Sequence, residues 1–223
     1  MRLETRNPKL KTQHSKPSLN FEQSVLTEHG PVLIAGVDEA GRGALAGPVV
    51  AAAVILPLHH PTSLARLIQV NDSKQLTSNQ REALLVLIQE MALTWGVGQV
   101  EAREIDQMGI LPATKEAMRQ AIMALNPAAG FVLVDGNVRL KNVAIPQQTI
   151  IRGDQLSLTV AAASIIAKVT RDRIMITQAQ QFPAYQFEQH KGYGTPQHLN
   201  LLAQHGPSTI HRYSFAPVRT TLF

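Results

Sequence analysis

Three acidic residues stand where an apolar segment of the chain meets a glycine-containing turn. Asp38 and Glu39 follow the apolar run 32–37, and Asp135 follows the run 131–134. Carboxylates crowded between apolar flanks repel one another, so they must take up protons or be neutralised by a cation. Hard oxygen ligands in a chain without cysteine select Mg²⁺ or Mn²⁺ over zinc. The pattern therefore favours a site for divalent metal ions.

The turns beside these acids have sequences that a phosphate group could approach closely. Residues 36–43 read Gly-Val-Asp-Glu-Ala-Gly-Arg-Gly, and residues 134–137 read Val-Asp-Gly-Asn. Glycine allows backbone conformations that bring amide groups near an anion. Each acid taken alone could equally cap a turn, because Asp before Gly is ordinary turn chemistry. The repetition of an apolar run, an acid and a glycine weakens that alternative.

Composition and charge are compatible with a polyanionic partner. The 223 residues include 21 Lys and Arg against 16 Asp and Glu, and the sequence pI is about 9.7. Residues 141–223 alone hold eight basic and three acidic residues. A basic surface near the C-terminus is the expected footprint of a nucleic-acid backbone. Charge by itself is explained equally well by a solvated face.

Several classes of protein are disfavoured. The chain contains no cysteine, which excludes disulfides and thiolate metal sites. Residues 1–20 lack the apolar core of a secretory signal, and the longest apolar stretch, 43–56, is too short and too interrupted to span a bilayer. We expect a cytoplasmic monomer without a membrane partner. Residues 1–28 have few large apolar side chains, which predicts a loose basic arm.

The elements that must position the acids alternate between strands and helices. Apolar runs predict strands over 32–38, 48–56, 94–100, 131–135 and 143–151. Helical spacing, capping residues and prolines predict helices over 78–93, 112–126, 157–180 and 195–206. The short glycine-rich turn after residue 40 favours antiparallel first strands, with parallel strands following. The prediction is an α/β fold with a mixed sheet, flanking helices and a C-terminal helical segment.

Six ordered sequence blocks make the chain resemble ribonuclease HII, the type 2 ribonuclease H of bacteria, from about residue 33 to residue 218. The blocks are Gly36-Val-Asp-Glu-Ala-Gly-Arg-Gly43, Asn71-Asp-Ser-Lys-Gln-Leu76, Val134-Asp-Gly-Asn137, Gly153-Asp154, Ala162-Ala-Ser-Ile-Ile-Ala-Lys168 and His190-Lys-Gly-Tyr-Gly-Thr195. The resemblance implies a ribonuclease H-like fold. It also implies a catalytic domain over 29–223 whose residues 182–223 form a helical substrate-binding part.

The resemblance implies four catalytic, metal-binding acids: Asp38, Glu39, Asp135 and Asp154. The residue pattern alone does not single out Asp154, because a lone Asp before a helix is more often a cap; Asp172 is a competitor that we expect to be structural. The implied reaction is hydrolysis assisted by two Mg²⁺ or Mn²⁺ ions, which leaves a 3′-hydroxyl and a 5′-phosphate. The implied substrates are RNA/DNA hybrids and DNA duplexes that contain ribonucleotides.

The Gly-Arg-Gly turn and one tyrosine would recognise the ribonucleotide. In relatives these groups sense the 2′-hydroxyl at the RNA-to-DNA junction, and here they are Gly41, Arg42, Gly43 and Tyr193. Basic residues of the matching blocks are candidate phosphate contacts, namely Lys74, Lys168, Arg171 and Lys191. His198 is compatible with a substrate contact or with a packing role.

Three other interpretations compete with this one. A metal phosphatase for small esters would want an Asp-x-Asp pair, where the chain has Asp38-Glu39. A protein that binds hybrids without cutting them would gain nothing from four acids facing phosphate. A type 3 ribonuclease H would carry a sizeable N-terminal domain, which about 30 polar residues cannot form.

Overall fold

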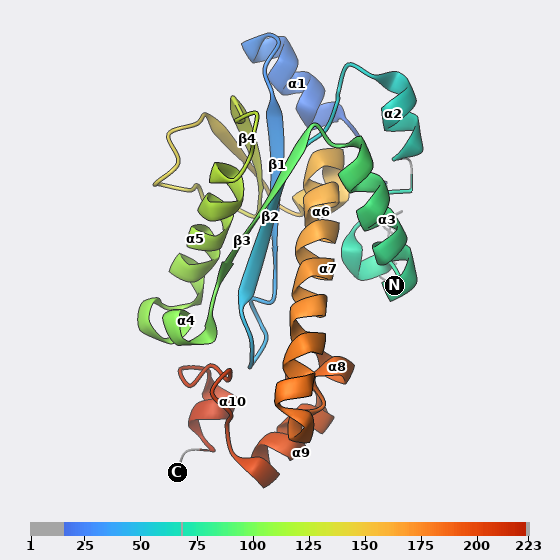
Figure 1. Cartoon of the computed structure of the whole chain (residues 1–223). Coiled ribbons are helices and arrows are strands. Elements are labelled where there is room, and N and C mark those ends of the chain that lie inside the picture. Colours follow the sequence, from blue (N-terminus) through green and yellow to red (C-terminus); the bar gives the residue numbers. More distant parts are fainter. Residues whose placement is uncertain (1–15, 68, 222–223) are drawn as a thin grey trace, which may run out of the picture.

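Five strands form one mixed sheet in the computed structural model of the chain, which describes residues 16–67 and 69–221 (Figure 1). The strands are β1 (Ile34–Ala40), β2 (Val49–Ile55), β3 (Thr94–Val100), β4 (Phe131–Asp135) and β5 (Gln147–Ile150), in the spatial order β3-β2-β1-β4-β5. The pairs β1/β2 and β2/β3 are antiparallel, whereas β1/β4 and β4/β5 are parallel. The predicted α/β fold with antiparallel first strands is confirmed.

Helices cover both faces of the sheet (Figure 1). Helix α5 (Ile110–Met123) packs on one face, and the long helix α7 (Leu158–Gln181), with α3 (Ser78–Met91) beside it, packs on the other. Two hydrophobic cores result, one on each side of β1 and β2. The remaining helices are α1 (Asn20–His29), α2 (Pro61–Arg66), η1 (Ser73–Gln75), α4 (Ala102–Met108), α6 (Gly153–Leu156), η2 (Pro183–Tyr185), α8 (Phe187–His190), α9 (Pro196–His205) and α10 (Ala216–Arg219).

A close approach between α7 and β1 sets the position of the sheet under the site. A Cβ atom at Gly36 would lie 2.2 Å from the carbonyl carbon of Thr159, so only glycine fits at this point of β1. On the other face, a Cβ atom at Gly98 of β3 would lie 2.2 Å from the carbonyl oxygen of Ala117 in α5. The two helices therefore lie directly against the sheet backbone, and they hold the strands that carry the acids with little freedom to shift.

The predicted loose arm over residues 1–28 is wrong for the part that the structure describes. Helix α1 is docked by the buried side chains of Glu22 and Val25. One Glu22 carboxylate oxygen accepts hydrogen bonds from Ser157 Oγ (2.7 Å) and from Thr159 N (3.0 Å) and Oγ1 (2.8 Å), at the first turn of α7. An acid at a helix N-terminus stabilises the helix, which explains how a short polar segment is ordered. Residues 1–15 lie outside the described part of the chain.

Other differences from prediction are local. Helix α4 was not predicted, although Glu101 and Glu104 form a capping box at its N-terminus. Strand β5 is shorter than the predicted range 143–151, because the Gln147 side chain bonds to the backbone of Leu140 and Val143 and holds residues 140–146 as a loop. Within residues 16–67 and 69–221, none of the helices is long and apolar enough to cross a lipid bilayer.

The C-terminal helices pack at one end of the sheet, around the segment that joins β1 to β2 (Figure 1). Residues 44–47 of that segment lie between two C-terminal loops. On one side Leu45 N donates to Gly192 O (2.8 Å), and on the other Gly47 N donates to Ile210 O (2.8 Å). Isolated bridges pair Ala44 with Tyr193 and Ala46 with His211. The turn after β1 and the C-terminal part are thereby fixed to each other.

Candidate active site

Asp38 and Asp135 emerge side by side from neighbouring parallel strands. Val37 of β1 is in register with Val134 of β4, and the pairing between these strands stops there. Asp38 was predicted to end its strand, but β1 continues to Ala40 along β2. It instead occupies the point where β1 loses its parallel neighbour. One carboxylate oxygen each from Asp38, Glu39 and Asp135 lies within 4.8 Å of the other two.

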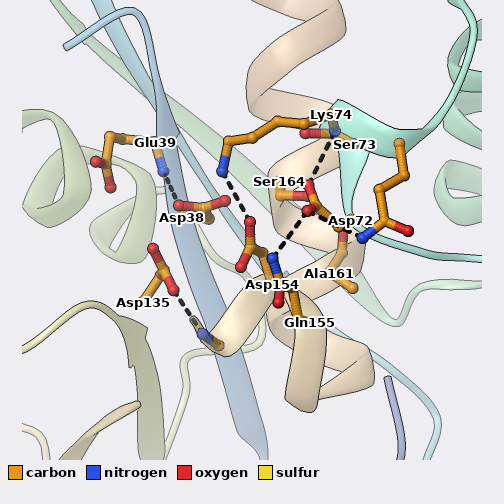
Figure 2. A network of polar contacts seen from close by, with 12 residues as sticks. Asp38, Glu39, Asp72, Ser73, Lys74, Asp135, Asp154, Gln155, Ala161 and Ser164 are labelled. Carbon is orange, nitrogen blue, oxygen red and sulfur yellow. Dashed lines mark hydrogen bonds and ion pairs between the residues drawn. The ribbon is translucent and has the colours of Figure 1, made fainter. Parts of the chain in front are cut away.

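Asp154 reaches the same region from the short helix α6. Its side chain is buried, and Figure 2 shows it beside Asp38 and Asp135. The backbone before it bends through Arg152, which has the left-handed φ of 59°, and Gly153 N then donates to Asp135 Oδ1 at 2.6 Å. The Asp154 Oδ2 atom accepts a hydrogen bond from Lys74 Nζ at 2.9 Å. The fourth acid thus lies beside Asp38 and Asp135 but outside the group of three whose oxygens lie within 4.8 Å of one another, with its charge turned towards a lysine.

Crowding and burial perturb the protonation of these acids. Asp38 is only 4% exposed. Burial, reinforced by the charges of Glu39 and Asp135, holds its pKa well above the usual range. Burial and the charge of Asp154 also raise the pKa of Asp135. For Lys74, loss of water around the ammonium lowers the pKa, but the hydrogen bond to Asp154 and the charges of Asp154, Asp38 and Asp72 together outweigh this effect and raise it.

The donor set fits a hard divalent cation. It consists of carboxylate oxygens alone, and two of the acids have raised pKa values that a cation between them would reverse. Mg²⁺ and Mn²⁺ prefer such oxygen ligands, and the described residues bring no histidine into the group. The arrangement can therefore bind metal ions at a place where negative side chains are stable together only when they are neutralised.

A hollow of about 380 Å³ opens above the acids, and its rim carries most of the predicted substrate contacts. The Arg42 side chain is exposed and bonds to Glu39 Oε1 at 3.0 Å. Tyr193 is half-buried and also lines the hollow, next to the turn, because it pairs with Ala44. The residues that line the hollow are Asp38, Glu39, Ala40, Gly41, Arg42, Gly43, Ser73, Lys74, Asp135, Lys168 and Tyr193.

Comparison with known proteins decides the family. A model of the family described as Ribonuclease HII matches residues 35–218. The chain belongs to the ribonuclease HII family. The ribonuclease HII of Chloroflexus aurantiacus is 52% identical over 205 residues, which cover 91% of this chain and 94% of that protein. Ribonuclease HII proteins are endoribonucleases that act on RNA/DNA hybrids, and the resemblance seen in the six sequence blocks is confirmed.

Solved structures agree with the fold of a ribonuclease HII. The crystal structure of ribonuclease H2 from Pyrococcus horikoshii has a TM-score of 0.70 and 29% identity, and the likeness covers 84% of this chain and 96% of that one. Bst-RNase HIII in complex with Mn²⁺ has a TM-score of 0.64 over 86% of this chain and 69% of that one. At 21% identity, the second likeness concerns the fold alone.

Two of the basic residues predicted to contact phosphate have other contacts in this chain. Arg171 is fully buried, and its guanidinium donates to the carbonyl oxygens of Pro48, Lys191 and Ala46 at 2.9–3.0 Å. The Lys191 ammonium donates to the Glu188 carbonyl, and Lys191 is not among the residues that line the hollow. Arg171 is therefore a structural residue, because its whole donor fork is used inside the protein.

Lys168, Asp172 and His198 each have a defined position. Lys168 lines the hollow, where its ammonium lies 2.6 Å from Asp172 Oδ1 and 5.3 Å from the centre of the Tyr193 ring. Asp172 also lies 3.8 Å from Arg81, so it acts as an ion-pair partner outside the acidic group, as expected. His198 is 0% exposed and cannot touch a substrate directly in this conformation.

Sequence reasoning missed two residues that shape the site. Asp72 is 3% exposed and accepts hydrogen bonds from Lys74 N (2.9 Å) and Gln155 Nε2 (3.2 Å), so it orients the segment that carries Lys74 (Figure 2). Arg212 is fully buried and donates to the carbonyl oxygens of Gly47 (3.0 Å) and Arg42 (2.9 Å). Asp72 could have been found from its place in the block 71–76, whereas Arg212 lies outside all six sequence blocks.

Proposed function

We propose that this protein hydrolyses the RNA strand of RNA/DNA hybrids and nicks duplex DNA on the 5′ side of a single embedded ribonucleotide. The proposal depends on one observation above all. Three carboxylates with oxygens within 4.8 Å of one another form the floor of a hollow whose rim carries the Gly-Arg-Gly turn and Tyr193. The products would be a 3′-hydroxyl and a 5′-phosphate. We expect the monomer to be the active form.

The four acids would hold two divalent cations, Mg²⁺ or Mn²⁺. Bound there, the cations would supply an activated water and neutralise charge on the leaving 3′ oxygen. Bst-RNase HIII, which shares the fold, has been solved with Mn²⁺. In this chain Asp38 and Asp135 would provide ligands from the sheet, and Asp154 would close the site from α6. The Gly153 amide would keep the Asp135 carboxylate turned inward through its 2.6 Å hydrogen bond.

The rim would recognise the ribose and the phosphate backbone. Gly43 is exposed with nothing within 4 Å of the place of a Cβ, so the backbone of the turn is open to a sugar there, while the buried Gly41 lines the hollow. The exposed Arg42 guanidinium can form a forked contact with a phosphate. The Tyr193 ring would pack against the deoxyribose that follows the ribonucleotide. Lys74 and Lys168 line the hollow and are suited to phosphate contacts, which position a duplex without reading its sequence.

The decisive experiment is incision of a DNA duplex that contains one ribonucleotide, with the cut mapped to the nucleotide. Incision 5′ of the ribonucleotide in the presence of Mg²⁺ or Mn²⁺, and none with EDTA, is the expected result. The all-DNA duplex should stay intact, and an Asp38→Asn variant should bind the duplex but not cut it. Full activity of that variant would refute the role of the acids. Binding without incision by the wild-type protein would instead favour a non-catalytic hybrid-binding protein.

A further inference from the structure

Three buried histidines lie behind Tyr193 and have no part in the proposed hydrolysis. His198 and His211 are 0% and 1% exposed, and His190 is also buried. The rings of His190 and His198 are stacked with their centres 4.3 Å apart, and the Nε2 atoms of His198 and His211 lie 3.0 Å apart. Buried polar rings are costly unless each nitrogen has a partner. Each of the three rings therefore has to find partners for its nitrogens inside the protein.

The hydrogen bonds of His198 fix its proton on Nδ1. The Nδ1 atom lies 3.0 Å from the carbonyl oxygen of Tyr193, which can only accept. Nδ1 must therefore carry the proton, and Nε2 of the neutral ring must be an acceptor. The group facing that acceptor is His211 Nε2, so His211 must donate from Nε2.

The contacts on the other side of His211 agree with this assignment. A neutral His211 protonated on Nε2 has an acceptor at Nδ1. The Ser208 backbone N–H donates to that atom at 2.9 Å, and the Ser208 hydroxyl lies 2.8 Å from it. One direction of donation therefore runs without conflict from Ser208 through His211 and His198 to the Tyr193 carbonyl. Burial lowers the pKa of both histidines to about 4, which keeps the rings neutral near pH 7.

The third ring holds the residue before Tyr193. His190 Nε2 lies 2.8 Å from the Tyr185 carbonyl oxygen and must donate to it, so Nδ1 accepts the hydrogen bond of Gly192 N–H at 3.2 Å. The amide of Gly192 and the carbonyl of Tyr193 are thereby both held by ring nitrogens. Gly192 has φ of +79°, and a Cβ there would lie 2.5 Å from the Ala46 carbonyl oxygen, so only glycine fits where the loop approaches the turn.

We propose that His198 and His211 are positioning residues, which fix the Tyr193 carbonyl through a chain of neutral rings with one defined direction of donation. The Tyr193 ring lies 5.1 Å from the Arg171 guanidinium carbon and 5.3 Å from Lys168 Nζ. A rotation of the Tyr193 peptide would move the ring relative to both cations and to the acids. Together with the Thr195 N–H, which donates to the same carbonyl at 2.8 Å, the hydrogen-bonded histidines therefore set how well the Tyr193 ring meets the nucleotide beside the scissile bond. This inference rests on the proposed substrate-reading role of Tyr193.

Two substitutions at one position separate positioning from packing. In His198→Asn the amide NH₂ takes the place of Nδ1 and can still donate to the Tyr193 carbonyl. In His198→Gln the amide reaches the place of Nε2, so it keeps the contact with His211 and loses the one with Tyr193. Each variant loses one buried hydrogen bond, so both should be destabilised to a similar extent.

The readout is the rate of incision at a single embedded ribonucleotide divided by the rate of cleavage of a continuous hybrid. We expect this ratio to stay within about twofold of wild type in His198→Asn and to fall about fivefold or more in His198→Gln, the equivalent of one lost hydrogen bond. Equal ratios in the two variants would overturn the inference. Tyr193→Ala is the reference. If the ratio for Tyr193→Ala equals that of wild type, the proposed role of Tyr193 in recognising the substrate is wrong. The proposed effect of the hydrogen-bonded histidines on that ratio is then wrong as well.

Nitrogen NMR of the histidine rings tests the chain without any substrate. Spectra of the whole protein at pH 7 should show His198 protonated on Nδ1, and His190 and His211 protonated on Nε2. A His198 ring protonated on Nε2, or a charged ring at either His198 or His211, would overturn the proposed direction of donation whatever the activity results.

Discussion

Replacing Asp38 by asparagine should stabilise the metal-free protein and abolish its activity. Two unit charges 4.8 Å apart repel by about 3 kcal/mol at an effective dielectric constant of about 20. Asparagine removes the charge but keeps an oxygen that can accept the 2.7 Å hydrogen bond from Glu39 N. Wild-type protein can escape part of the repulsion by binding a proton, so we expect a gain of about 1–3 kcal/mol. For a chain of this size, at roughly 2–4 °C per kcal/mol, the gain corresponds to a rise in Tm of between about 2 and 12 °C.

The gain should depend on pH with a definite sign. Burial and neighbouring acids raise the pKa of Asp38 in the folded protein above its unfolded value. The folded wild type therefore binds the proton more tightly than the unfolded chain does, and it loses stability as pH rises through the interval between the two pKa values. The Asp38→Asn variant does not lose stability in this way, because asparagine does not titrate. The advantage of Asp38→Asn should be large at pH 8 and small near pH 4.

The assay is thermal unfolding in EDTA at pH 8 and pH 5, followed by the same scans with Mg²⁺. Mg²⁺ should raise the Tm of wild type more than that of Asp38→Asn, because a ligand stabilises the state that binds it. Asp72→Asn is the matched control, since Asp72 is equally buried but uses its oxygens to accept hydrogen bonds from Lys74 and Gln155. It should bring no gain at either pH. A lower Tm for Asp38→Asn than for wild type at pH 8 in EDTA would refute the reasoning.

Three further predictions concern the rim. Lys74→Met removes the cation 2.9 Å from Asp154, and because the lysine side chain is 75% exposed, the free energy of unfolding should change by less than about 1 kcal/mol. The Mg²⁺ concentration for half-maximal activity should fall, and KM for a hybrid should rise. If neither this Mg²⁺ concentration nor KM changed, the result would count against the role of Lys74. Gly41→Ala places a Cβ 1.9 Å from Arg171 Nε at a φ of +93°, and should cost about 2–4 kcal/mol in urea unfolding. Gly43→Ala, with nothing within 4 Å, should unfold within about 0.5 kcal/mol of wild type and yet cleave hybrids more slowly; normal cleavage would exclude a close approach of substrate there.

The strands that carry the acids could be predicted because their environment is uniform along the sequence. The runs before Asp38 and Asp135 are buried on both faces, so they read as continuous apolar segments. The glycine-rich turn after residue 40 likewise indicated the antiparallel pairing of β1 with β2, which the register confirms. These features depend on neighbours within a few residues, and a single sequence contains that information.

Contacts between distant segments could not be predicted in this way. Helix α1 is anchored by Glu22, whose partners lie about 135 residues further along the chain. Asp154 belongs to the site only because Arg152 turns the backbone towards Asp135, and without the family motif it would have been taken for a helix cap. A residue pattern records which side chains are apolar or charged, but the convergence of segments depends on packing across the whole sheet.

The pair of buried arginines beneath the Gly-Arg-Gly turn is the clearest example of contacts between distant segments. Arg171 and Arg212 donate only to backbone carbonyls, and within residues 16–67 and 69–221 neither forms an ion pair. Burial lowers the pKa of Arg212 to about 9, so the guanidinium is still charged near pH 7. A positive charge enclosed in protein is screened less than one in water, and it attracts anions at the surface above it. Both arginines hold the segment that joins β1 to β2, because Arg171 donates to the carbonyl oxygens of Ala46 and Pro48 and Arg212 to those of Arg42 and Gly47. They therefore rigidify the turn that would meet the polyanion.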